Sequence, residues 1–310
     1  SILNIYNIYQ NFVNYVFKKS FSINKKYISS IATTIIGGIY AFFGFIGNFV
    51  SLDGVLPQEL PFYSKVLISL AILVFLWIVC FLIVGCTLSR RKRFEVICGN
   101  NGHKLYVQYG DLFDANEVLN PCERRNIIIP VNRCFDTIVD NHLVSEQTLH
   151  GIAFKQLYSS GRYTEQSLNA AIQRQLSNQP YQDIDIIDKP EGNIRRYPVG
   201  TIADIPSDET THLFLWALST FNRELKAQTS MQDYALAVQK LIEACNSESE
   251  GFPILIPLVG TGLSRTKKDQ KDVLSYLVQA FKLNKSELNC DIHIIVRETI
   301  KSDIPIMNLK

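Results

Sequence analysis

The sequence lacks the cysteine patterns of disulfide-stapled and zinc-binding proteins. Its 310 residues contain seven cysteines, an odd number, and no two of them form a CxxC pair. Neither a disulfide framework nor a structural zinc site is therefore indicated, and scattered free thiols are typical of a reducing cytosol. The net charge of +2 is also too small to indicate a protein that binds nucleic acid.

Several catalytic signatures are missing as well. The five histidines show no metal-ligand spacing. Ser264 lies in GTGLSR rather than in Gly-x-Ser-x-Gly, so a hydrolase nucleophile elbow is unsupported. No Gly-Lys-Ser/Thr follows the glycines of that segment, which excludes a Walker A loop. We therefore predict no catalytic residue, no metal and no resident cofactor.

Charge is nearly absent from residues 28–86. Residues 66–85 read VLISLAILVFLWIVCFLIVG, and about 20 uncharged residues suffice to cross a hydrocarbon core of about 30 Å. Residues 28–50 are a weaker candidate span because they include serine, threonine and asparagine. The sequence thus predicts a two-helix transmembrane hairpin over residues 28–86.

Small residues form a stripe in the first span. Gly37, Ala41, Gly44 and Asn48 are spaced by four, three and four residues, so a helix places them on one face. Small residues let helices approach closely in lipid, and an asparagine can bond across the contact. The stripe fits a homo-oligomeric contact and packing against the second span equally well.

Basic residues flank the two spans on the same side. They are Lys18, Lys19, Lys25 and Lys26 before the first span, and Arg90, Arg91, Lys92 and Arg93 after the second. The connecting segment instead carries Asp53 and Glu59, with Lys65 as its single cation. The positive-inside rule therefore places both termini in the cytoplasm. Residues 1–27 are aromatic and apolar and predict an interfacial amphipathic helix, with a third embedded segment as the alternative.

From residue 94 onward, apolar runs alternate with helical periods. The predicted strands are 94–97, 104–110, 126–132, 201–205, 212–220, 254–260 and 292–298, and the predicted helices are 145–158, 164–175, 230–246 and 268–284. Apolar strands that alternate with amphipathic helices indicate a sheet covered on both faces. The polar stretch 177–193 predicts a surface loop.

One strand end carries a glycine-rich turn. The strand that ends at Val259 is followed by Gly260-Thr261-Gly262 and by a lysine-rich helix start. Glycines let a backbone approach a ligand closely, and the free N–H groups and positive dipole of a helix start attract phosphate. A pyrophosphate site and a plain tight turn are equally compatible with this pattern.

Two further strand ends carry polar side chains. Asp111 follows Gly110, and the strand 126–132 delivers Asn132, Asp136 and Thr137 into a loop. Ligands of α/β sheets bind beyond the carboxyl ends of the strands. Convergence of three such ends predicts one ligand site.

These three segments resemble, in order, the motifs of the macro domain, a module that binds ADP-ribose. They are Gly110-Asp111-Leu112, Ile129–Asn132 and Leu258–Arg265. The resemblance covers roughly residues 94–300 and implies a three-layer α/β/α fold with a mixed sheet over residues 94–310. It implies that Asp111 binds the adenine amino group, that Asn132 and its loop contact ribose, and that the glycine-rich loop holds the phosphates. The implied ligand-binding residues are Asp111, Leu112, Asn132, Phe135, Asp136, Thr137, Val259, Gly260, Thr261, Gly262, Leu263 and Arg265.

Two positions depart from the family pattern. Phe135 stands where the usual loop has a second asparagine, and residues 137–140 read TIVD in place of the glycine-rich stretch of members that hydrolyse ADP-ribose esters. The missing glycine-rich stretch argues against hydrolysis and indicates that the distal end of the ligand is not plain ADP-ribose. A membrane-tethered ADP-ribosyl hydrolase with Asp136 as acid or base stays an alternative.

The order of two spans and a macro-like domain resembles the membrane-anchored effectors of bacterial Thoeris anti-phage systems. That resemblance implies a partner enzyme with a TIR domain, which consumes NAD and makes an ADP-ribose derivative, a histidine conjugate in this subtype. The effector then senses the derivative, forms a homo-oligomer and disrupts the lipid of the inner membrane, which aborts the infection. A third hypothesis is a channel or transporter subunit with a nucleotide-gated domain.

Overall fold

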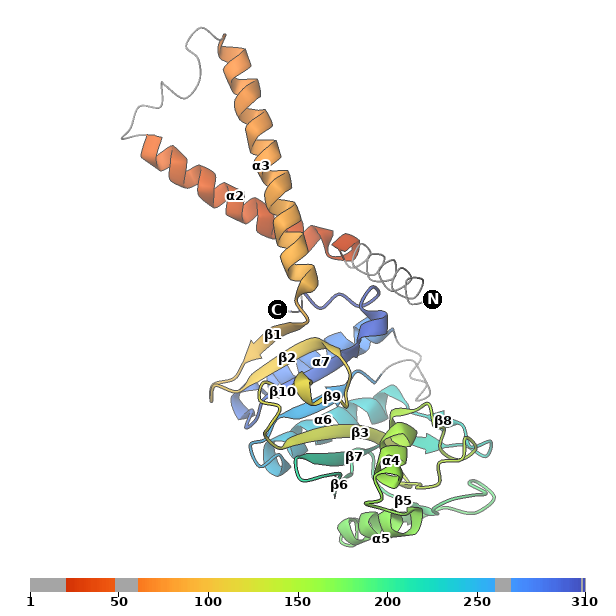
Figure 1. The fold of residues 1–310 in the computed structure, drawn as a ribbon. Coiled ribbons are helices and arrows are strands. Elements are labelled where there is room, and N and C mark those ends of the chain that lie inside the picture. The colour runs from red at the N-terminus through yellow and green to blue at the C-terminus, as the bar shows by residue number, and fades with distance from the viewer. Residues whose placement is uncertain (1–20, 48–60, 260–268, 308, 310) are drawn as a thin grey trace, which may run out of the picture. The chain divides into compact units, whose positions relative to one another are not determined.

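The computed structural model describes residues 21–47, 61–259, 269–307 and 309 (Figure 1). The chain divides into two compact units. One unit ends at Lys92 and takes in residues 299–307, and the other runs from Arg93 to Glu298.

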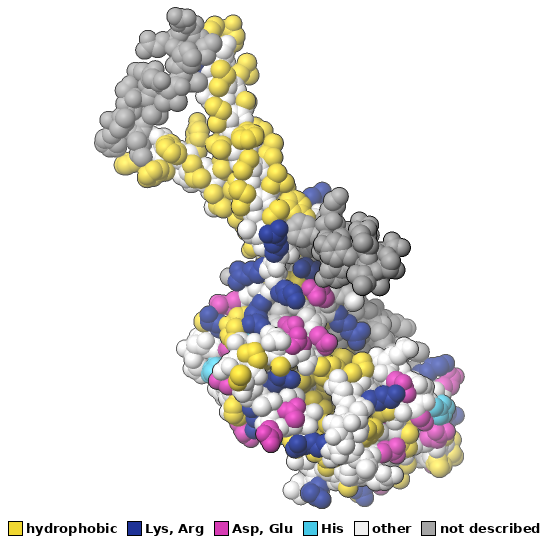
Figure 2. Space-filling view, in the orientation of Figure 1, with side chains coloured by type: hydrophobic (Ala, Val, Ile, Leu, Met, Phe, Trp, Pro, Cys, Tyr) yellow, Lys and Arg dark blue, Asp and Glu magenta, His cyan; other side chains and the backbone are white. Residues whose placement is uncertain are grey.

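Two long helices form the first unit. They are α2 (Lys25–Gly47) and α3 (Phe62–Arg90), and both are long and apolar enough to cross a membrane. Figure 2 shows hydrophobic side chains over the described surfaces of these helices. Such exposed apolar surface is costly in water and favourable in lipid, which accounts for the near absence of charge from residues 28–86.

The two helices contact each other through the first half of α2. Ile28 and Ala32 are fully buried there, and the Trp77 indole Nε1 donates a hydrogen bond of 3.0 Å to Thr33 Oγ1. Further along α2, a Cβ added to Gly37 or Gly44 would meet no heavy atom of the described residues within 4 Å. The reading in which the stripe packs against the second span is therefore wrong for these two glycines, while Asn48 lies outside the described residues.

The second unit is built on a mixed sheet. Its strand order is β1 (Arg93–Cys98), β2 (Lys104–Gly110), β10 (Ile292–Arg297), β9 (Ile254–Pro257), β3 (Arg125–Asn132), β7 (Thr211–Phe221) and β6 (Ile202–Pro206), with β8 (Ala227–Gln228) paired to β7. The five inner strands run parallel, and β1, β6 and β8 are antiparallel to their neighbours. Burial on both faces explains why β3 and β7 read as nearly continuous apolar runs.

Helices cover both faces of this sheet (Figure 1). One face carries α4 (Leu149–Ser159) and α5 (Glu165–Gln175), and the other carries α6 (Met231–Glu248) and α7 (Gln270–Leu283). Short 3-10 helices lie at η1 (Ala115–Glu117), η2 (Lys285–Glu287) and η3 (Glu298–Ile300). The predicted three-layer α/β/α arrangement is confirmed.

Alternate residues of the central strands supply the two cores. Ile127, Ile129 and Val131 of β3 pack in one cluster with residues of α4 and α5. On the opposite face, the Trp216 indole of β7 donates a hydrogen bond of 3.2 Å to the Ala237 carbonyl of α6. Each of the helices α4, α5, α6 and α7 begins at a polar cap residue. The side chain of that residue accepts a hydrogen bond from a backbone amide in the first turn. The caps are Thr148, Thr164, Ser230 and Asp269.

The polar stretch 177–193 differs from the surface loop that its composition predicts. It contains β4 (Gln182–Asp183), which pairs with β5 (Arg195–Arg196) in a small separate sheet. Most of the stretch is exposed, but Lys189 is only 1% exposed. The prediction is therefore wrong for Lys189, because a partner distant in sequence buries its ammonium group.

Candidate functional site

The carboxyl ends of β2, β9 and β3 lie at one edge of the sheet. The three strands are parallel, and β10 and β9 stand between β2 and β3. Three inter-strand spacings place the ends of β2 and β3 about 14 Å apart. Asp111 and Asn132 therefore flank the chain that leaves β9 at Val259, which suits an extended ligand with its middle over β9.

At the end of β2, the Asp111 side chain is exposed. Its Oδ1 accepts a hydrogen bond of 3.1 Å from the Phe113 amide. Leu112 is 4% exposed and belongs to the core cluster on the α4 and α5 face. Of the two residues predicted here, Asp111 faces solvent and can meet a ligand, while the Leu112 side chain serves the core.

At the end of β3, Asn132 is 3% exposed. Its Oδ1 accepts bonds from the backbone amides of Cys134 at 3.0 Å and Asp136 at 3.5 Å. Its Nδ2 has no hydrogen-bond partner among the described residues. A buried amide donor without a partner is costly, so such a group commonly serves a ligand or an ordered water.

The loop after β3 has a strained backbone. Phe135 has a φ of +52° and is fully buried, with its ring edge-to-face on Tyr197 at a centroid distance of 5.6 Å. A bulky residue rarely adopts positive φ, and such strain persists only where surrounding contacts enforce it. The Thr137 carbonyl accepts a bond of 2.6 Å from the Tyr158 hydroxyl of α4. The loop is thus held from both sides before any ligand arrives.

A buried ion pair provides much of that support. Lys189 Nζ donates to Asp136 Oδ1 at 3.0 Å, to the Glu191 carbonyl at 2.7 Å and to the Asn193 carbonyl at 2.8 Å. The two charged side chains are 1% and 0% exposed. All three ammonium hydrogens have acceptors, as a buried lysine requires.

Asn193 and Gly192 complete this support. The Asn193 backbone amide donates a hydrogen bond of 2.6 Å to Asp136 Oδ1. The Asn193 Nδ2 donates a hydrogen bond of 3.0 Å to the Phe135 carbonyl. Gly192 has a φ of +81°, and a Cβ there would overlap Asp136 Oδ1. Sequence reasoning missed all three residues of this support, because no local pattern marks a lysine or asparagine that pairs with a distant loop.

The surroundings of Asp136 bear on its predicted role. Burial raises the pKa of its carboxyl above the ordinary value, and Lys189 and the Asn193 amide pull it partly back. Because the carboxylate is enclosed and paired, an acid or base role would require the ion pair with Lys189 to break. The geometry favours Asp136 as a support of the loop.

The remaining predicted residues follow β9. Val259 is 8% exposed. The glycine-rich loop residues lie outside the described part of the chain: Gly260, Thr261, Gly262, Leu263 and Arg265. The helix start that the sequence places after this loop is present, since α7 begins at Gln270 with Asp269 as its cap.

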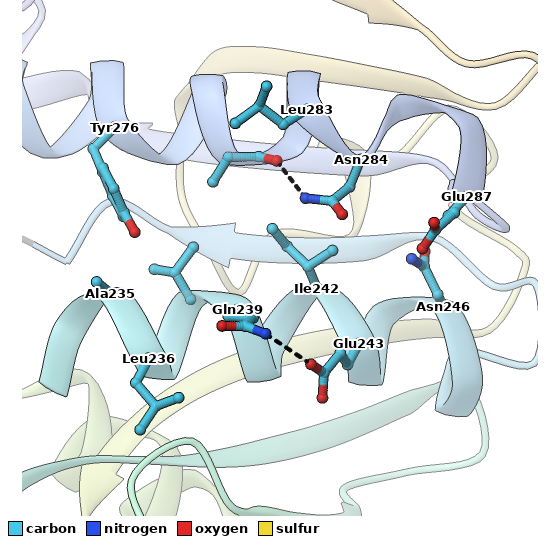
Figure 3. Close-up of a pocket in the computed structure, with 12 residues that line it drawn as sticks. Ala235, Leu236, Gln239, Ile242, Glu243, Asn246, Tyr276, Leu283, Asn284 and Glu287 are labelled. Atoms are coloured by element: carbon cyan, nitrogen blue, oxygen red, sulfur yellow. Dashed lines mark hydrogen bonds between the residues drawn. The ribbon is translucent and has the colours of Figure 1, made fainter. Parts of the chain in front are cut away.

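A separate groove of about 490 Å³ lies between α6 and α7 (Figure 3). Leu236 and Ile242 of α6 and Tyr276 of α7 are among its lining residues. Its lining runs from Ala235 to Asn246 of α6 and from Tyr276 of α7 to Glu287, and it includes neither Asp111 nor Asn132. Within the described ranges, no three His, Cys, Asp or Glu side chains are grouped to hold a metal ion.

Two solved structures are similar to part of this chain. A mutant macrodomain of Oceanobacillus iheyensis with ADPR has a TM-score of 0.42 and 12% identity, and the match covers 68% of this chain and 93% of that one. The macrodomain of the same organism with ADP has a TM-score of 0.38 and 11% identity, and covers 68% and 91%.

Sequence comparison identifies the family. A curated relative, the Thoeris protein ThsA of Bacillus amyloliquefaciens (strain Y2), is 26% identical over 192 residues, which is 60% of this chain and 59% of that protein. The match thus spans less than two thirds of the relative's length. The family profile described as Thoeris protein ThsA, Macro domain, matches residues 105–297, which is more than half of the chain. The chain belongs to the Thoeris ThsA macro-domain family.

Proposed function

We propose that this protein is an anti-phage effector in which a cytoplasmic macro domain binds an ADP-ribose derivative. A TIR-domain partner enzyme supplies the derivative from NAD, and a histidine conjugate of ADP-ribose is the form expected. Ligand binding drives homo-oligomerisation through the membrane helices, and the assembly disrupts the inner membrane. Both termini and the macro domain face the cytoplasm, as the flanking basic residues require.

The Nδ2 of Asn132, which has no hydrogen-bond partner among the described residues, carries the binding part of this proposal. It is a buried donor at the carboxyl edge of the sheet, within a loop that Lys189 and Asn193 hold in a strained conformation. A hydroxyl or phosphate oxygen of the ligand would satisfy it at little reorganisation cost. Asp111 lies about 14 Å away across β10 and β9, so one extended nucleotide can reach both residues.

The open glycines of α2 support the assembly part. Gly37 and Gly44 have no described neighbour within 4 Å of a Cβ position, so their face is available to another helix. In lipid, helices associate where small residues permit close packing. A ligand can shift such an assembly only by as much as its affinity differs between the two states.

Calorimetry on the full chain in detergent tests the binding site. We expect ADP-ribose or its histidine conjugate to bind, and Asp111→Ala and Asn132→Ala each to weaken binding by about 1–3 kcal/mol, because each loses a polar contact. Asp208→Ala is the matched control, since Asp208 lies in the turn before β7, at the opposite edge of the sheet. If neither compound binds the wild-type chain, the sensing account fails. Turnover of an ADP-ribosylated substrate that is lost in Asp136→Ala would instead identify a hydrolase.

Dye release from vesicles tests the assembly face. We expect Gly44→Leu to keep the ligand affinity of the wild type and to abolish ligand-dependent release, because leucine prevents close helix approach. Ile39→Leu is the control, since Ile39 is a 45% exposed apolar residue of the same helix. Undiminished release by Gly44→Leu would show that the stripe has no role in assembly.

A further inference from the structure

A partly buried polar network surrounds the buried Gln108 side chain near the end of β2. Gln108 is 1% exposed, and its Nε2 donates to the Glu117 carbonyl at 2.8 Å and to Glu117 Oε2 at 2.5 Å. Because both amide hydrogens point to Glu117, the Gln108 Oε1 is the acceptor for other groups. Arg93 Nε donates to it at 2.7 Å. His293 Nδ1 lies 2.9 Å from the same oxygen and must carry the proton there.

Glu117 connects this network to the candidate ligand site. Its Oε1 accepts a hydrogen bond of 3.3 Å from the Asp111 backbone amide. Its carboxylate also lies against Gly110, where a Cβ would overlap the carboxylate atoms. Glu117 therefore holds the two residues at the end of β2, and Asp111 cannot shift without changing this contact.

Arg93 connects the same network to the membrane helix. Only Arg91 and Lys92 separate it from Arg90, the last residue of α3. Arg93 opens β1 and pairs in register with Gln108, because β1 runs antiparallel to β2. The amino end of β1 therefore lies at the edge of the sheet that also carries Asp111.

Two further contacts fix the position of the Arg93 side chain. The Arg93 Nη2 donates a hydrogen bond of 2.5 Å to the Glu117 carbonyl. The Arg93 guanidinium carbon lies over the Tyr106 ring, 5.8 Å from its centroid. Tyr106 in turn stacks on His293 at a centroid distance of 4.9 Å. The planar guanidinium thus meets Gln108, Glu117 and an aromatic face at once, an arrangement that a lysine ammonium cannot reproduce.

We propose that Arg93, Gln108 and Glu117 form the link through which a ligand at Asp111 acts on the chain leaving α3. The proposal rests on the proposed function. A ligand that displaces Asp111 changes the contact of its amide with the Glu117 carboxylate. Glu117 then moves relative to Arg93 and Gln108, and Arg93 carries the change to the segment that joins it to α3. Charge-assisted bonds in a partly buried site transmit such a displacement because breaking them is costly.

The test uses the full chain in phosphatidylethanolamine–phosphatidylglycerol vesicles with ADP-ribose and its histidine conjugate as probes. Binding and dye release are measured on the same samples. We expect Arg93→Met to keep the probe affinity within about twofold of the wild type and to raise the probe concentration for half-maximal release at least about tenfold. Arg93→Lys should resemble Arg93→Met, because lysine keeps the charge but cannot make the same pair of bonds.

The control is Lys104→Met. Lys104 also bonds across β1 and β2, to Glu95 at 2.8 Å, but at the end of the strand pair remote from Asp111. It should behave as the wild type in both measurements.

Each other result overturns the link. Wild-type dye release by Arg93→Lys would show that only the positive charge of Arg93 matters, as for a residue that sets membrane topology. Unchanged dye release by Arg93→Met would show that Arg93 has no role in the coupling. Equal loss of binding and release in both variants would make Arg93 a support of the binding site. Absence of probe binding by the wild type would overturn the proposed function, and the link with it.

Discussion

Removing the charge of Lys189 tests how the candidate ligand loop is held. In Lys189→Met, Asp136 keeps its place in the interior but loses the ammonium group at 3.0 Å. Both side chains are at most 1% exposed, so solvent cannot replace the missing charge. Breaking a buried pair by removing one partner costs about 3–5 kcal/mol. For a domain of this size, each kcal/mol corresponds to about 2–4 °C, so we expect the melting temperature to fall by about 6–20 °C.

Thermal unfolding of the full chain in detergent, followed by near-UV circular dichroism, measures this loss. Lys240→Met is the matched control. Lys240 pairs with Glu243 at 2.7 Å, but both side chains are about half exposed, and such surface pairs contribute about 0–1 kcal/mol. The two lysine variants should therefore differ by several degrees.

A second substitution separates charge from packing. Asp136→Asn in the Lys189→Met background removes the unpaired carboxylate and should recover part of the lost stability, because a neutral amide costs less to bury than a charge. A loss in Lys189→Met no larger than in Lys240→Met, or no recovery in the double variant, would refute the account of a tightly coupled buried pair.

Two further predictions concern stability. Burial lowers the pKa of both His150 and His293 from 6.5 to about 3. Because each pKa is lower in the folded state than in the unfolded state, only the unfolded chain takes up a proton below pH 6.5. The stability is therefore full above pH 6.5 and decreases as the pH falls toward 3. Between pH 7 and pH 5, each histidine should lower the free energy of unfolding by roughly 2 kcal/mol. Urea unfolding at the two pH values measures this loss. His293→Gln should remove about half of it. Gly192→Ala should destabilise the protein by at least about 1 kcal/mol more than Gly161→Ala, because both positions have positive φ but only Gly192 would place a Cβ against Asp136. Equal unfolding midpoints for the two alanine variants would contradict the second prediction.

The two long apolar helices and the layered fold could be predicted from the sequence because both follow from local patterns. An uncharged apolar run such as residues 66–85 favours a long apolar helix, and α3 at Phe62–Arg90 contains it. The predicted helix 164–175 corresponds to α5, whose start at the Thr164 cap follows directly from the sequence. The two-residue strands β4, β5 and β8 were not predictable, because a pair of residues has no measurable period.

The three strand ends of the candidate site could also be anticipated, because the polar residues follow apolar runs directly. Their arrangement on one edge needed the strand order, in which β10 and β9 separate β2 from β3 although they come later in the chain. Leu112 illustrates the limit of the motif. Its position predicts a ligand contact, while the direction of its side chain is set by core packing.

The sequence by itself determined the apolar hairpin, the α/β class and the positions of the polar strand ends, since each depends on neighbouring residues alone. Only the tertiary structure decided that Asp136 is paired with Lys189 and that Arg93 meets Gln108 and Glu117. The physical reason is that these contacts join residues from distant parts of the chain. Their energies depend on burial and on the geometry of the facing group, which no local pattern records.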